Sequence, residues 1–102
     1  MKECCKAYLD EQFGGDAEII GEIYSEYVSS VRGKIKEAQE ALAGTAWDPL
    51  DKVAHAVKGN ALAAGDQEMA NVAIALRNAA KLQNSEESAG LIAQMEGLLA
   101  KL

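Results

Sequence analysis

The sequence has one proline, one histidine and few aromatic residues, and it has no long uninterrupted apolar run. A membrane-spanning helix needs about 20 mostly apolar residues, so none is expected, and residues 1–5 do not resemble the apolar segment of a signal peptide. Scarce proline together with abundant alanine, leucine, glutamate and lysine is typical of a helical protein. We therefore expect one cytoplasmic, all-α domain that covers residues 1–102.

Cysteine is also scarce, and the only two cysteines, Cys4 and Cys5, are adjacent. Neighbouring Cα atoms lie about 3.8 Å apart, whereas an unstrained disulfide requires about 4.4–6.8 Å, so we expect two reduced thiols. A metal site would need more ligands than these thiols and a single histidine provide. The sequence predicts neither a metal site nor a cofactor bound to this chain.

The charge of the chain is negative and unevenly distributed. A net charge of −6 argues against nucleic acid and against an anionic membrane as partners. Residues 48–83 carry four basic and four acidic side chains, so the whole acidic excess lies outside this segment. The neutral segment contains the only histidine, His55.

Apolar residues at spacings of three and four predict five helices, two of them before residue 44. A short helix over residues 3–12 is expected to end at Gly14 and Gly15. Asp16 is a favourable N-cap for a long helix over residues 16–43, about 40 Å in length. The predicted apolar stripe of this long helix comprises Ile19, Ile20, Ile23, Tyr27, Val31, Ile35, Ala38 and Leu42.

Three shorter helices are expected after residue 47. The third helix is predicted to begin with Asp48 as N-cap and Pro49 at its first helical position, where the missing N–H does no harm. Asp66 caps the fourth helix after an interruption at Gly65, and Ser85 lies in the first turn of the fifth. Connections this short force neighbouring helices to run antiparallel. The sequence therefore predicts an antiparallel up-down four-helix bundle with a short additional N-terminal helix at one end.

His55 is predicted to lie on the solvent-facing side of the third helix. At about 100° per residue it falls about 140° from Leu50, whereas the apolar stripe of this helix stays within about 60°. Its neighbours on the same ridge are Asp51, Lys58, Gly59 and Leu62.

These neighbours suit a phosphoryl-acceptor site. The neutral imidazole of His55 can act as a nucleophile, and Lys58 can stabilise the charge of an attached phosphoryl group. Gly59 costs about 1 kcal/mol relative to alanine within a helix, which close approach of a partner would explain, with helix–helix packing as the alternative. Leu62 offers an apolar contact. We count Lys52, Gly59 and Leu62 as predicted docking residues.

The segment Ala54-His55-Ala56-Val57-Lys58-Gly59-Asn60, followed by Gly65, resembles the signature of histidine-containing phosphotransfer (HPt) domains. That signature reads Ala-His-x-hydrophobic-Lys-Gly, with a further glycine ten residues after the histidine. The resemblance extends over most of the chain, including residues 13–16, 41–42 and 65–69, together with Trp47 and Leu76.

The resemblance implies a phosphoryl carrier and not an autonomous enzyme. His55 would accept a phosphoryl group from an aspartate of one receiver domain and relay it to another, with Lys58 stabilising the group. The implied partners are response-regulator receiver domains and a hybrid sensor histidine kinase. Phosphoryl transfer depends mostly on positioning and charge neutralisation. Mg²⁺ is accordingly expected on the partner receiver domain.

One residue departs from the family pattern. After the position of Leu76 the family often has Glu or Gln, which can hydrogen-bond the histidine, but this chain has Arg77. If Arg77 faces His55, its charge would disfavour the imidazolium and favour the phosphorylated form. Arg77 is therefore a second candidate for phosphoryl stabilisation.

The sequence by itself is compatible with other functions. A chemotaxis-type kinase could phosphorylate His55 directly, or the chain could be a non-phosphorylated receiver-binding module. A sugar-transport phosphocarrier also uses a histidine, but on a β-containing fold that the helical pattern excludes. A structural bundle without a partner is the least specific alternative.

Overall fold

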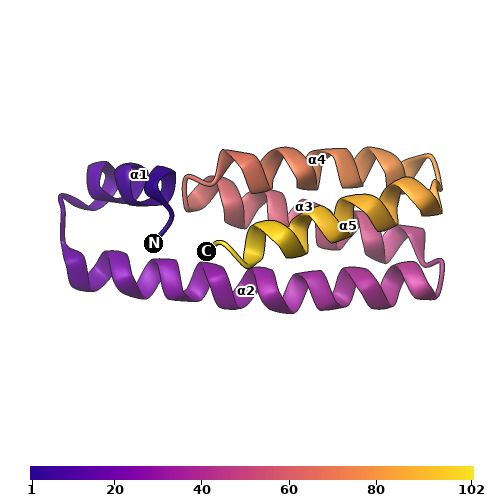
Figure 1. The fold of residues 1–102 in the computed structure, drawn as a ribbon, viewed down its shortest axis with the longest axis horizontal. Helices are drawn as coiled ribbons and strands as arrows, with labels where there is room; N and C mark the ends of the chain where they lie inside the picture. Colours follow the sequence, from indigo (N-terminus) through magenta and orange to yellow (C-terminus); the bar gives the residue numbers. More distant parts are fainter.

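The computed structural model describes all 102 residues and contains five helices joined by short turns (Figure 1). They are α1 (Glu3–Phe13), α2 (Ala17–Ala43), α3 (Trp47–Ala63), α4 (Gln67–Lys81) and α5 (Ser85–Leu99). Helices α2 to α5 run alternately up and down, so the predicted all-α antiparallel bundle is confirmed. None of the helices combines the length and the apolar character that crossing a lipid bilayer requires.

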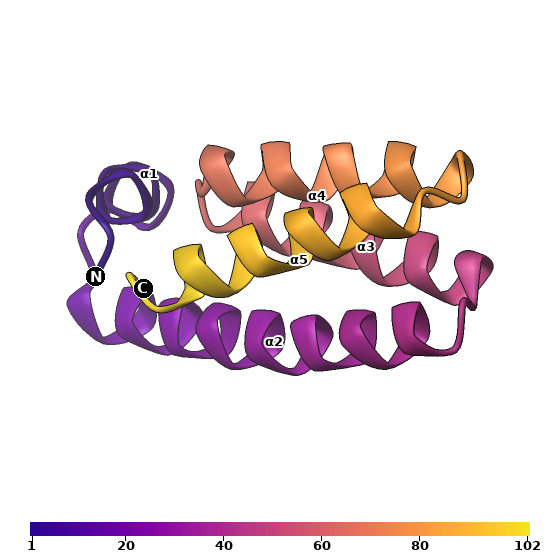
Figure 2. The ribbon, with the colours of Figure 1, turned by 45° about the vertical axis from the view of Figure 1, so that its right-hand side comes forward.

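The bundle is elongated, measuring 42 × 20 × 18 Å, and the 27-residue helix α2 runs along its whole length. Helix α1 lies over the first part of α2, at the end of the bundle where α3 is followed by α4 (Figure 2). Both chain termini lie at this same end. The phenol oxygen of Tyr24 joins them, because it accepts the backbone N–H of Lys2 at 3.1 Å and donates to the carbonyl of Leu102 at 3.0 Å.

Most predicted helix boundaries are correct, but the start of α3 is not. The side chains of Asp16 and Asp66 accept backbone N–H groups of Ile19 and Met69, as N-caps do. Helix α3, in contrast, begins at Trp47 and not after an Asp48 cap. The carbonyl of Ala46 already accepts the N–H of Leu50 at 3.0 Å, which places Asp48 within the first turn.

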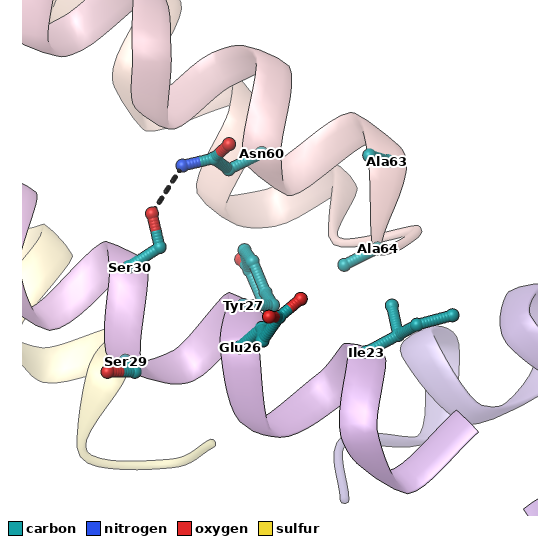
Figure 3. Close-up of a pocket in the computed structure, with 8 residues that line it drawn as sticks. All are labelled: Ile23, Glu26, Tyr27, Ser29, Ser30, Asn60, Ala63 and Ala64. Carbon is teal, nitrogen blue, oxygen red and sulfur yellow. Dashed lines mark hydrogen bonds between the residues drawn. The ribbon is translucent and has the colours of Figure 1, made fainter. Parts of the chain in front are cut away.

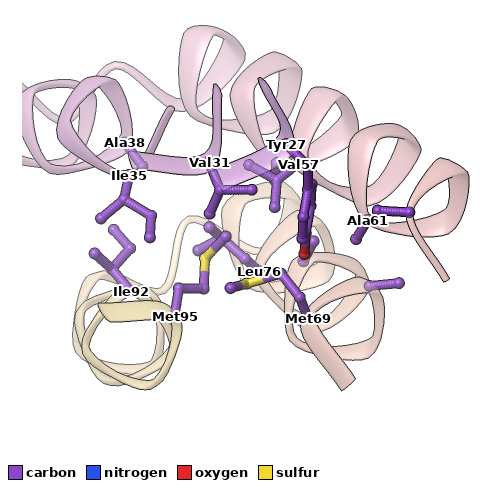
Figure 4. Close-up of a cluster of buried hydrophobic side chains, with 14 of the residues drawn as sticks. Tyr27, Val31, Ile35, Ala38, Val57, Ala61, Met69, Leu76, Ile92 and Met95 are labelled. Atoms are coloured by element: carbon purple, nitrogen blue, oxygen red, sulfur yellow. The ribbon is translucent and has the colours of Figure 1, made fainter. Parts of the chain in front are cut away.

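The hydrophobic core draws on every helix. Figure 4 shows the part of it that lies between α2, α3, α4 and α5. Its largest fully buried side chains include Leu9, Leu50, Met69, Leu76 and Met95. One predicted core position is wrong: Ile19 is 43% exposed, whereas Tyr24, absent from the predicted stripe, is buried. Ile19 lies about 100° around α2 from the buried Ile20, so it falls outside the face that the bundle covers.

Many of the buried residues on α3 and α4 are alanines, and these two helices pack closely together. The buried alanines are Ala54 and Ala61 on α3 and Ala70, Ala73, Ala79 and Ala80 on α4. Small side chains allow two helices to approach closely. This close approach brings polar side chains at the edges of α3 and α4 within hydrogen-bonding reach of one another.

Asp66 is fully buried and ties α1 and α2 to the start of α4. Its Oδ1 accepts from Lys2 Nζ at 2.8 Å, and its Oδ2 accepts from the hydroxyl of Tyr27 at 2.6 Å. Lys2 also pairs with Glu68 at 2.9 Å. Burial and the hydrogen bond to Asp66 raise the pKa of Tyr27, so its hydroxyl remains a donor. A buried carboxylate needs such partners to offset its loss of hydration.

The turn between α3 and α4 also depends on glycine. Gly65 has a φ of +75°, a conformation that residues with a Cβ rarely adopt. A Cβ at this position would overlap the side chain of Tyr8 on α1. Gly65 therefore provides both the backbone turn and the space in which α1 docks.

The two cysteines are expected to differ sharply in reactivity. Cys4 is exposed, whereas Cys5 is fully buried, and burial together with the nearby charge of Asp66 raises the pKa of the Cys5 thiol to about 12. Because the thiolate is the reactive species, iodoacetamide at about pH 8 should modify Cys4 alone. Mass spectrometry should find one label on the folded protein and two after denaturation. Equal labelling of both thiols in the folded state would contradict this burial.

Candidate functional site

Helix α3 buries one face and presents His55 on the other. Leu50, Ala54, Val57 and Ala61 are fully buried, whereas His55 is exposed, as the helical periodicity predicts. The only histidine of the chain is therefore accessible to a partner protein.

Arg77 of α4 reaches across to His55. Its Nη1 lies 3.1 Å from His55 Nδ1, and its Nε donates to Asp51 Oδ1 at 3.0 Å. Asp51 and His55 are one turn apart on α3, so a single guanidinium contacts both. The flank of α4 that carries Arg77 thus faces His55. The role of Arg77 toward a phosphoryl group remains a prediction.

The pair of Arg77 and Asp51 is only partly open to solvent, because each side chain is 27% exposed. The hydrogen bond from Arg77 lowers the pKa of Asp51, so this carboxylate stays charged at a pH where an ordinary aspartate begins to take up a proton. Because the pKa is lowered in the folded state, the stabilising effect of the pair is present above the ordinary value. This effect is lost only as the pH falls through the lowered pKa of Asp51.

The other cations near this face have no carboxylate partner. Lys58 is half-buried, Lys52 and Lys81 are exposed, and none of the three forms an ion pair. The ammonium groups of Lys52 and Lys58 are therefore available to an anionic group on a partner surface. The stabilising role of Lys58 and the docking role of Lys52 remain predictions.

The surface beyond His55 is open and partly apolar. A Cβ on Gly59 would meet no atom within 4 Å, which excludes helix–helix packing as the reason for this glycine. Leu62 is 42% exposed, and its docking role remains a prediction. Ile74 on α4 is 41% exposed and lies three residues before Arg77, a candidate contact that the sequence interpretation missed. The sequence identifies Asp51 only as a neighbour of His55, because no sequence pattern pairs it with Arg77.

A surface hollow of about 530 Å³ lies on the other flank of α3, against α2 (Figure 3). Its lining includes Tyr27, Ser30 and Asn60, and Asn60 donates to the hydroxyl of Ser30 at 2.8 Å. The hollow includes neither His55 nor Arg77. The histidine site is therefore separate from this hollow.

Comparison with known families agrees with this geometry. The family model described as Hpt domain matches residues 22–102, which comprise α3 to α5 and all of α2 except its first five residues. Comparisons with curated proteins and with solved structures give no match. The match covers well over half of the chain and includes His55, Lys58 and Gly59. The chain therefore belongs to the Hpt domain family, the histidine phosphotransfer modules of two-component signalling.

Proposed function

We propose that His55 accepts a phosphoryl group from the aspartyl phosphate of one receiver domain and relays it to an aspartate of another. The observation that carries this proposal is the orientation of the exposed imidazole. Arg77 occupies Nδ1 at 3.1 Å, and no side chain of the protein bonds Nε2. Nε2 is therefore the ring nitrogen that a docked receiver can reach.

The transfer is a substitution at phosphorus. The lone pair of Nε2 attacks, the P–O bond to the aspartate breaks, and the carboxylate leaves with the bonding electrons. Delivery to the next receiver reverses these steps. The charge on the transferred group is spread over three oxygens, so nearby cations stabilise it. Lys58 and Arg77 are suited to this task, with Lys58 free of any competing carboxylate.

The partner would supply the remaining chemistry. No group of three or more metal-ligating side chains gathers in this structure. We propose that Mg²⁺ and the acidic residues that bind it belong to the receiver domain, and that this chain is the carrier. A hybrid sensor histidine kinase would provide the first phosphorylated receiver. We place the relay in the cytoplasm, the reducing compartment in which free thiols such as Cys4 and Cys5 persist.

Incubation with a phosphorylated receiver domain tests the proposal. The expected product is an acid-labile, base-stable phosphate on this protein, followed by its loss to a second, unphosphorylated receiver. Phosphorylation by a chemotaxis-type kinase with ATP, but by no receiver, would instead support direct phosphorylation. Binding to receivers without any phosphate on the chain would identify a non-phosphorylated docking module.

The open surface at Gly59 leads to a further prediction. Gly59→Ala should stabilise the isolated protein by about 0.8–1 kcal/mol, because alanine favours helix and its Cβ meets no neighbour. Gly59→Gln should fold normally but slow transfer from a receiver by about tenfold or more, because the added side chain occupies the docking surface. Thermal unfolding and transfer rates measure the two effects.

Gly33 provides the matched control. It also lies within a helix, but on α2, and a Cβ at this position would likewise meet no atom within 4 Å. Gly33→Ala and Gly33→Gln should therefore change stability like their counterparts at position 59 and leave transfer unchanged. Equal transfer rates for Gly59→Gln and Gly33→Gln would exclude Gly59 from the docking surface.

A further inference from the structure

The contact between Arg77 and His55 restricts where the imidazole can carry its proton. A guanidinium has only N–H donors and remains charged at any physiological pH. At 3.1 Å from Arg77 Nη1, the Nδ1 atom of His55 must therefore present a lone pair. In a neutral ring the proton then lies on Nε2. In an imidazolium, both nitrogens carry protons and the contact is lost.

Asp51 holds the guanidinium in this position. It accepts from Arg77 Nε at 3.0 Å, while Nη1 of the same guanidinium points to the ring. The lowered pKa of Asp51 keeps this support ionised in mildly acidic solution. The charged groups around the ring are Asp51 and Lys58 on α3 and Arg77 and Lys81 on α4. Asp51 is the only anion among them, and Arg77 engages it.

From these contacts we propose that Arg77, positioned by Asp51, is a proton clamp that keeps Nδ1 unprotonated both in resting His55 and in its phosphorylated form. The inference rests on the proposed function, and it adds a control over when the phosphoryl group can move. Its consequences differ before and after transfer.

Before transfer, the clamp holds the ring in a form that cannot attack. Nε2 carries the proton, so it has no free lone pair. Arg77 must leave Nδ1, and the proton must pass through solvent from Nε2 to Nδ1. Nε2 then attacks phosphorus, the P–O bond breaks and the carboxylate departs. The product is a phosphorylated imidazolium with a proton on Nδ1. That proton passes to water, and Arg77 Nη1–H returns to the Nδ1 lone pair.

After transfer, the clamp protects the P–N bond. This bond breaks readily only when Nδ1 is protonated, because the leaving group is then a neutral imidazole and not an imidazolate anion. With Arg77 on Nδ1, that protonation is suppressed and hydrolysis is slow. For delivery, Arg77 moves away, a solvent proton adds to Nδ1, and the receiver carboxylate attacks phosphorus. The P–N electrons return to Nε2, and a neutral ring remains.

The resting state can be tested without any partner. In ¹⁵N-labelled protein at about pH 8, two-bond ¹H–¹⁵N correlations of His55 distinguish the two neutral tautomers. The wild type should carry its proton on Nε2. Arg77→Gln should shift the population toward the Nδ1–H form, because the glutamine oxygen can accept that proton. Asp51→Asn should give an intermediate population. A wild-type ring protonated mainly on Nδ1 would overturn the clamp.

The phosphorylated state can also be tested without a partner protein, because a small phosphodonor can supply the phosphoryl group. Protein phosphorylated with phosphoramidate should lose its phosphate at about pH 7 roughly tenfold faster in Arg77→Gln than in the wild type, because the Arg77 hydrogen bond no longer occupies the Nδ1 lone pair. Asp51→Asn should lie between the two. The rates should converge in acid, where both rings are protonated. ³¹P spectra or intact masses measure the decay.

Lys81→Gln is the matched control, because it removes one positive charge from the same flank of α4 without a contact to Nδ1. It should leave both the tautomer and the phosphate lifetime close to wild type. If Lys81→Gln shortens the phosphate lifetime as much as Arg77→Gln, the positive charge of this flank explains the effect, and the contact with Nδ1 does not. If instead the clamp tests succeed but no receiver phosphorylates the protein, the proposed relay fails and the proton control stands.

Discussion

Replacing His55 by glutamine is expected to abolish phosphoryl transfer, with a loss of at least about 1,000-fold, as when an enzyme loses its nucleophile. The chain contains no second histidine, so no other imidazole can take the place of His55 as phosphoryl acceptor. Transfer from a ³²P-labelled receiver, followed by acid and base treatment, measures the loss. Wild type and variant should be compared at equal concentrations.

The His55→Gln variant should keep its fold, so a loss of transfer would report on the missing imidazole alone. His55 is exposed and its one side-chain contact is with Arg77, so we expect a stability change within about 0.5 kcal/mol. Receiver binding should survive, because the docking residues are unchanged. Phosphate that persists on the variant with the same chemical stability would move the acceptor to another residue and refute the role of His55.

Replacing Asp66 by alanine is expected to be the most destabilising of the changes considered, at about 3 kcal/mol. The change leaves the buried hydroxyl of Tyr27 and the ammonium of Lys2 without their shared acceptor, and it removes the N-cap of α4. For a domain of this size the midpoint of thermal unfolding should fall by roughly 12–24 °C. Circular dichroism measures that midpoint directly.

Asp16→Ala is the control that distinguishes the loss of the buried contacts of Asp66 from the loss of an N-cap alone. Asp16 caps α2 through a 3.2 Å bond from the N–H of Ile19, but it is exposed and has no side-chain partner. Its loss should cost about 1 kcal/mol, the usual value of an N-cap. Equal losses of stability in Asp16→Ala and Asp66→Ala would show that the buried contacts of Asp66 do not contribute to the stability of the fold.

The charge pair between Lys2 and Asp66 should also persist over a wide pH range. Burial by itself lowers the pKa of Lys2, but its hydrogen bonds to Asp66 and Glu68 outweigh that effect and raise the pKa above 10.5. Because this pKa is raised in the folded state, its contribution to stability is present below the ordinary lysine value. It is lost only in more alkaline solution.

Local patterns were sufficient for most of the secondary structure. Asp16 and Asp66 cap helices where the sequence predicts them, because an N-cap bond joins residues only three apart. The prediction failed at Asp48, where the backbone of Ala46 already begins the helix. It also failed at Ile19, because periodicity gives the direction of a face but not how much of it a neighbouring helix covers.

By itself, the sequence determined the five-helix pattern, the exposed position of His55 and the motif with Lys58 and Gly59. These features depend on residues within about two turns of one another, and helical geometry relates such residues directly. Only the tertiary structure decided which distant groups meet. Arg77 reaches His55 across 22 residues of chain and Asp51 across 26, and Asp66 becomes a buried acceptor for Lys2 and Tyr27. Such pairings depend on the rotation and the close approach of packed helices, which no single helix encodes.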